Sequence, residues 1–206
     1  MSLTPKLNRS AVVGGIAALA LIGGGIAFAA QSGDDDSSGP TIRPPSKSLD
    51  HIDSTTPAET AVAVSRRLYA SSPVVMVADA VDKESQELAM SAAETLSVPV
   101  LLDGPSTADE IKRLDASTVL TFGRTGTYDH GRAVTKASVA SETARMRKSY
   151  DTTDAARLQV FVLTSSASTD AVAAATARNA GATVLELPGG DPRADPEVAK
   201  AIAAEP

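Results

Sequence analysis

Hydrophobic and polar positions divide this chain into three blocks. Residues 11–30 contain no charged or strongly polar side chain, and residues 31–56 are rich in Ser, Asp, Pro and Gly. Beyond residue 56, short apolar runs alternate with segments whose apolar residues recur at helical spacing. We therefore predict an N-terminal apolar segment over 1–30, a disordered linker over 31–56 and a folded domain over 57–206.

The first half of the folded domain reads as three helix–strand pairs. Thr56 and Asp82 are suited to cap helices, and Pro57 fits a first helical turn. Ser106 with Asp109 resembles a capping box for a third helix. The pattern predicts helices over 57–68, 82–96 and 106–114, and strands over 74–78, 98–102 and 117–122, the last one ended by Gly123.

The second half of the domain repeats this order of strands and helices, with a weaker pattern. It predicts a strand over 159–164, a helix over 169–180, a strand over 182–187 and a final helix from Asp195. The two halves align without a gap, with Val75 on Val160, Ala89 on Ala174, Ala92 on Ala177 and Leu102 on Leu187. Such spacing suggests duplicated βαβ units.

Strands that are apolar throughout and joined by helices indicate a parallel sheet covered on both sides. The predicted fold class is therefore α/β. We expect an open, doubly wound, mostly parallel sheet with helices on both faces, preceded by one N-terminal transmembrane or signal helix.

The N-terminal segment has the length of a membrane span. As a helix, residues 11–30 would be about 30 Å long, which matches the bilayer core. Lys6 and Arg9 precede the segment and three Asp residues follow it, so the N-terminus should be cytoplasmic and the domain extracytoplasmic. Two outcomes stay open: a retained anchor that contacts the membrane through 11–30, or a signal peptide cleaved near Ala29 that releases the domain to the cell envelope.

Composition narrows the class of partner. The net charge is −6 and the pI is near 4.9, which argues against nucleic-acid binding because phosphates would be repelled. The chain has no Cys, so it has neither disulfides nor thiolate metal sites.

Two acids are expected where ligands bind in such sheets, at the carboxyl ends of the strands. Asp79 and Asp103 follow adjacent predicted strands and could hold Mg²⁺ together with waters. The other interpretation, which we favour, is that they satisfy turns and helix starts. The chain contains none of the G-x-S-x-G, P-loop or G-x-G-x-x-G motifs, and His51 and His130 are isolated in sequence, so we expect no catalytic activity, no metal and no cofactor.

Residues 124–157 interrupt the repeat and concentrate basic and aromatic side chains. A helix over 138–149 would place Arg145 and Lys148 on one face. Such a region could bind an anionic polymer or an acidic partner, or it could be an ordinary solvated helix. The binding candidates are Arg124, Tyr128, Arg132, Arg145 and Lys148.

Five segments in order carry a family resemblance: E-T-A at 59–61, and the segments 74–78, 88–93, 99–102 and 119–123. Together they resemble the cell wall-binding repeat type 2 family, well over 56–124 and in degenerate form over 158–187. The sequence departs from the family where its F-P-D-A-L motif is lost in 83–88 and where its closing G-G is Gly123-Arg124.

The resemblance implies an actinobacterial-type envelope protein that binds an anionic cell-wall glycopolymer or other wall polysaccharide non-covalently. The family typically has three tandem repeats, whereas this chain has about one and a half. Two alternatives stay open. The protein could be an accessory subunit that docks onto a membrane protein complex, or a hydrolase of wall sugars or phosphate esters acting through Asp79 and Asp103.

Overall fold

The computed structural model describes residues 39–44, 52, 54, 56–148, 161–164, 170–186, 195–196 and 199–200. None of the helices within these ranges is long and apolar enough to cross a bilayer. The span predicted at 11–30 and the cleavage site near Ala29 lie outside the described residues.

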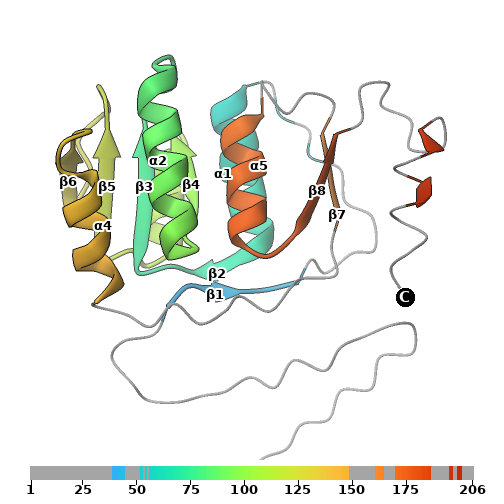
Figure 1. Cartoon of the computed structure of the whole chain (residues 1–206), viewed down its shortest axis with the longest axis horizontal. Coiled ribbons are helices and arrows are strands. Elements are labelled where there is room, and N and C mark those ends of the chain that lie inside the picture. The colour runs from blue at the N-terminus through green and yellow to red at the C-terminus, as the bar shows by residue number, and fades with distance from the viewer. Residues whose placement is uncertain are drawn as a thin grey trace, which may run out of the picture. The chain divides into compact units, whose positions relative to one another are not determined.

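Four parallel strands form the central sheet, in the order β4-β3-β5-β6 (Figure 1). All residues of β3 and β4 are buried, as their uninterrupted apolar sequences predict. The α/β class and the parallel sheet are therefore confirmed. The strands are β3 (Val74–Ala78), β4 (Val100–Leu102), β5 (Thr118–Phe122) and β6 (Gly131–Val134).

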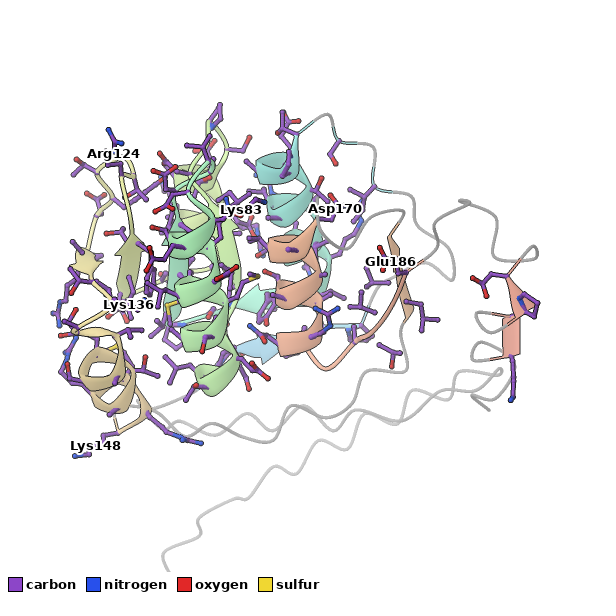
Figure 2. The ribbon with its side chains drawn as sticks, turned by 45° about the horizontal axis from the view of Figure 1, so that its top comes forward. Lys83, Arg124, Lys136, Lys148, Asp170 and Glu186 are labelled. Carbon is purple, nitrogen blue, oxygen red and sulfur yellow. The ribbon has the colours of Figure 1, made fainter. Side chains whose placement is uncertain are left out.

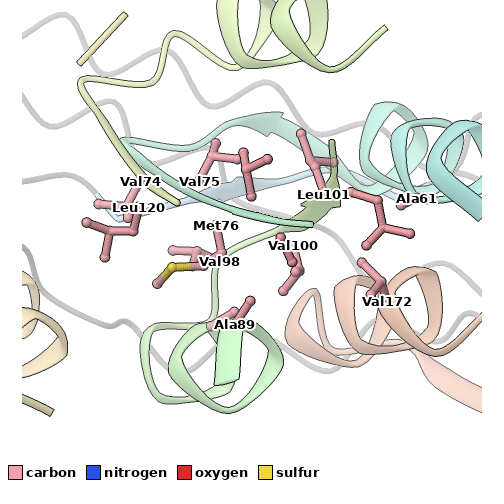
Figure 3. Close-up of a cluster of buried hydrophobic side chains, with 14 of the residues drawn as sticks. Ala61, Val74, Val75, Met76, Ala89, Val98, Val100, Leu101, Leu120 and Val172 are labelled. Atoms are coloured by element: carbon pink, nitrogen blue, oxygen red, sulfur yellow. The ribbon is translucent and has the colours of Figure 1, made fainter. Parts of the chain in front are cut away.

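Side chains from three helices converge on β3 and β4 in the core. Figure 3 shows Ala61, Ala89 and Val172, from three different helices, around these two strands. Each of the three side chains is at most 4% exposed. The helices are α1 (Pro57–Leu68), α2 (Lys83–Leu96) and α5 (Ala171–Asn179).

Two of the three predicted helix caps are confirmed. The Thr56 hydroxyl accepts a hydrogen bond from the Glu59 amide (3.3 Å), and the Asp82 carboxylate accepts one from the Glu84 amide (3.2 Å). The prediction of a capping box at α3 (Thr107–Arg113) is wrong, because the Ser106 side chain makes no cap hydrogen bond. Its backbone is helical (φ −94°, ψ −1°) rather than extended, the conformation that a cap residue requires.

A strand lies within the segment predicted to be a disordered linker. β1 (Thr41–Ile42) pairs antiparallel with β2 (Tyr69–Ser71), and the Arg43 amide donates to the Leu68 carbonyl (2.9 Å). Ile42 is partly buried against the core. The prediction of a disordered linker over 31–56 is therefore wrong at 41–42, because one apolar side chain and a free strand edge are enough to bind this stretch to the domain.

The interruption at 124–157 also contributes to the sheet. Residues 131–134 form β6, which pairs in parallel with β5. α4 (Val139–Arg147) follows, within the predicted helix over 138–149, and it packs against α2. A basic region expected to lie outside the repeat is thus the continuation of the sheet and its helical cover.

The second half forms a βαβ unit, as the repeat predicts. β7 (Phe161–Thr164) and β8 (Thr183–Glu186) pair in parallel on either side of α5 in sequence. The aligned alanines are all buried: Ala89 and Ala177 are 0% exposed, and Ala92 and Ala174 are 3% exposed. The two strands form a separate sheet, however, and do not extend the central one. At the predicted final helix, the Ala199 amide donates to the Asp195 carbonyl (2.9 Å).

Side chains of α5 occupy the free edge of β4. The Thr176 hydroxyl accepts from the Val100 amide (3.0 Å) and donates to the Val100 carbonyl (2.6 Å). Asn179 donates to the Val98 carbonyl (2.9 Å). These bonds satisfy polar groups that would otherwise invite another strand, so the central sheet ends at β4.

A buried carboxylate joins α1, α3 and β2. The Glu110 side chain is 0% exposed and accepts hydrogen bonds from Ser65 (2.6 Å), Arg66 (3.0 Å) and Arg113 (2.7 Å). Arg113 also donates to the carbonyls of Tyr69 (3.0 Å) and Ala70 (3.2 Å). The cluster therefore ties two helices to the strand that holds β1.

Candidate functional site

Asp79 follows β3 and is engaged by backbone donors. One carboxylate oxygen accepts from the Val81 amide (2.9 Å) and the other from the Arg124 amide (3.3 Å). The pKa of Asp79 is lowered, chiefly because the Val81 N–H stabilises the ionised carboxylate. This arrangement is that of a turn residue.

Asp103 follows the neighbouring strand, β4, and is engaged in the same way. It accepts from the Gly126 amide (3.1 Å) with one oxygen and from the Tyr128 hydroxyl with the other. The pKa of Tyr128 is raised above 10.0, first by burial and then by the hydrogen bond to Asp103. Tyr128 is partly buried and its hydroxyl is bonded to Asp103, so it supports the turn after β4.

Residues 123–130, here called the strap, connect β5 to β6 without a helix. The bonds to Asp79 and Asp103 fix the strap at the carboxyl ends of β3 and β4, where ligands usually bind in such sheets. Each oxygen of both carboxylates already accepts a hydrogen bond. This geometry favours the turn interpretation of the two acids over the magnesium and hydrolase interpretations.

We predict that Gly123→Ala destabilises the domain by about 1–2 kcal/mol. Gly123 begins the strap with φ +78°, and an added Cβ would lie 2.9 Å from Asp79 Cβ and 2.5 Å from Ser85 Oγ. Urea unfolding would measure the change. Gly126→Ala is the matched control, because its Cβ would meet nothing closer than 3.4 Å. Equal losses for the two variants would contradict the prediction.

A second prediction concerns alkaline pH. Because folding raises the pKa of Tyr128, the unfolded chain releases this proton first as the pH rises past 10.0. The stabilisation that comes from the neutral hydroxyl is present below pH 10 and decreases above it. Urea unfolding at pH 8 and pH 11 should therefore show a larger drop in stability for the wild type than for Tyr128→Phe. Identical drops would show that Tyr128 does not titrate abnormally.

The basic candidates lie on the β6–α4 side of the domain. We define the basic face as six exposed side chains that carry the positive charge of residues 124–148, a segment with only two acids. The net charge of residues 124–148 is +4. Because the whole chain has a net charge of −6, the other residues together carry −10. Figure 2 shows Arg124, Lys136 and Lys148 at successive levels from one end of this side to the other. The six residues are Arg124, Arg132, Lys136, Arg145, Arg147 and Lys148.

Acidic side chains pair with part of this face. Lys136 lies 3.1 Å from Glu84 of α2, with the two side chains 78% and 66% exposed. Arg132 and Arg145 both contact Glu142. The structure therefore brings together only two of the predicted candidates, Arg132 and Arg145, which share Glu142. Arg124 and Tyr128 lie in the strap, and Lys148 lies at the end of α4.

A groove of about 460 Å³ lies between α3 and the strap. Its lining includes Asp109, Lys112, Asp115 and His130, the last with φ +59°. The sequence did not predict this groove, because the strap has no periodicity from which its path could be inferred.

Scans against protein-family models, curated protein sequences and solved structures each found no match to this chain. The resemblance to the cell wall-binding repeat family therefore stays a prediction that rests on the motifs themselves.

Proposed function

We propose that this protein is a membrane-anchored, extracytoplasmic, non-catalytic protein that binds an anionic cell-wall glycopolymer through the basic face. The observation that carries the proposal is the net charge of +4 on residues 124–148, which include β6 and α4, in a chain whose other residues sum to −10. The proposed protein has an open, doubly wound domain, and an N-terminal transmembrane or signal helix carries that domain across the membrane.

The charge distribution supports binding at one place. An acidic body repels a polyanion, while the basic face attracts it, so the field both orients the polymer and restricts where it can lie. All six cations of the basic face are exposed. Arg124, Lys136 and Lys148 lie at successive levels along this side of the domain, which suits a linear ligand better than a small one (Figure 2).

The engaged state of Asp79 and Asp103 supports a non-catalytic role. A hydrolase would need one carboxyl group free to exchange a proton with substrate. If wall sugars or phosphate esters are hydrolysed at all, we expect Asp79→Asn to leave the turnover unchanged. Loss of turnover in this variant would favour the hydrolase alternative.

Co-sedimentation with purified cell walls tests the proposal. The fragment to use is 35–206, because residues 35–205 form one compact unit that includes β1. We expect it to pellet with walls at 20 mM salt and to be released at 500 mM, since salt screens charge attraction between exposed groups.

A matched pair of double variants locates the site. Arg147→Gln with Lys148→Gln should weaken pelleting, whereas Lys83→Gln with Lys112→Gln, which removes the same charge outside the basic face, should not. A fragment that stays in the supernatant at low salt would overturn the proposal. Recovery of integral membrane proteins with the full chain in detergent would then favour the accessory-subunit alternative.

A further inference from the structure

One acid lies between two arginines on the basic face. Glu142 Oε2 accepts from Arg132 Nη1 (3.1 Å), Arg145 Nη2 (2.7 Å) and Arg145 Nε (3.2 Å). A single carboxylate oxygen thus receives three N–H donors from two guanidinium groups. The side chains stay partly open to solvent, at 22% exposure for Glu142, 49% for Arg132 and 46% for Arg145.

The two arginines are anchored on different elements. Arg132 lies on β6 opposite Leu120 of β5, so sheet pairing fixes its backbone. Arg145 lies on α4 next to Met146, which is 5% exposed and part of the core. Because each backbone is held independently of the Glu142 side chain, both guanidinium groups remain within reach of an anion that takes the place of the carboxylate.

Guanidinium groups bind carboxylate and phosphate oxygens with the same N–H geometry. Glu142 Oε2 therefore marks the position that an oxygen of an anionic ligand would take. Glu142 lies one turn before Arg145 on the same helix, and it can turn away by a change of side-chain rotamer without moving the backbone.

We infer that Arg132 and Arg145 form an oxyanion clamp, and that Glu142 is an internal competitor that occupies the clamp in the absence of ligand. The inference rests on the proposed function and deepens it. The clamp binds an individual phosphate or carboxylate group of the glycopolymer, and Glu142 lowers the affinity for that group.

Arg147 and Lys148 provide a contrast on the same face. Both are exposed at the end of α4, and neither side chain has an ion pair or hydrogen bond to another described residue. No described residue orients these two side chains, so we expect them to attract a polyanion mainly by charge, whereas Arg132 and Arg145 are arranged around one oxygen position. Neutralising Arg132 and Arg145 should therefore weaken binding more than neutralising Arg147 and Lys148.

The test uses fragment 35–206, with inorganic polyphosphate and polygalacturonate as separate probes at 50 mM salt. Calorimetric titration should show that Glu142→Gln binds about 3- to 10-fold tighter than the wild type. Asp109→Asn on α3 is the equal-charge control, with an expected change below about twofold. Arg132→Gln with Arg145→Gln should weaken binding about tenfold, and Arg147→Gln with Lys148→Gln about two- to threefold. Tighter binding of polyphosphate would identify phosphate as the preferred group, and tighter binding of polygalacturonate would identify carboxylate.

Each outcome decides between the two proposals. If the wild type binds, but Glu142→Gln binds no tighter than Asp109→Asn, or the two double variants lose equally, the clamp is wrong and the proposed function stands. If only Glu142→Gln binds, the clamp stands and polymer binding by the wild type fails. If no variant binds either probe, both are wrong. Circular dichroism of each variant verifies that it is folded.

Discussion

Glu110→Ala will lower the free energy of unfolding by about 3 kcal/mol. Glu110 is fully buried, and its removal leaves Ser65, Arg66 and Arg113 without the acceptor they share. Loss of one partner from a buried ion pair commonly costs about 3–5 kcal/mol. We expect the lower end, because Arg66 and Arg113 are 48% and 29% exposed and can regain water.

Urea unfolding of fragment 35–206 measures this loss. Glu94→Ala, at an exposed position of α2, is the control and should change stability by less than about 0.5 kcal/mol. Glu110→Gln keeps the size and one acceptor oxygen, so its loss should be intermediate. A Glu110→Ala variant as stable as the control would mean that the cluster contributes nothing to holding α1, α3 and β2 together.

Thr176→Val is expected to lower stability by about 2–4 kcal/mol, although valine has nearly the same shape as threonine. The hydroxyl satisfies both the amide and the carbonyl of Val100 in a buried setting (3.0 and 2.6 Å). Valine leaves both groups unpaired at the edge of β4. Each unsatisfied buried group costs about 1–3 kcal/mol.

Thr176→Ser is the matched control, because it keeps the hydroxyl and should retain most of the stability. Hydrogen exchange adds a local measurement: the Val100 amide should exchange faster in Thr176→Val than in Thr176→Ser. Unchanged protection of that amide in the valine variant would show that α5 does not cover this edge of the sheet.

The sequence predicted the elements with the strongest local signals. β3 and β4 are short and wholly apolar, and Thr56 and Asp82 have the side chains that helix caps require. β6 was missed because Val134 is its one buried residue, so no apolar run or alternation marks it. β1 was missed because two residues in a polar stretch carry no periodic signal.

The features of the site that the sequence did not predict depend on contacts between residues far apart in the chain. The parallel-sheet rule placed Asp79 and Asp103 at neighbouring strand ends, but their partners belong to the strap, whose path no pattern specifies. No local pattern marks Glu110 as a buried acid, since its partner Arg66 lies 44 positions away. The basic residues of 124–148 were evident by composition, whereas the position of Glu142 between two of them depends on how β6 and α4 pack.

The docking of β1 sets how far the domain can travel from a lipid anchor. Ten residues, 31–40, separate the apolar segment 11–30 from Thr41. Fully extended, they reach at most about 35 Å, whereas the whole stretch 31–56 would reach about 90 Å. If residues 11–30 remain in the bilayer, the domain works within a thin zone next to the lipid headgroups. Under the proposed function, such a domain would bind only the part of a wall polymer that lies within this distance of the membrane.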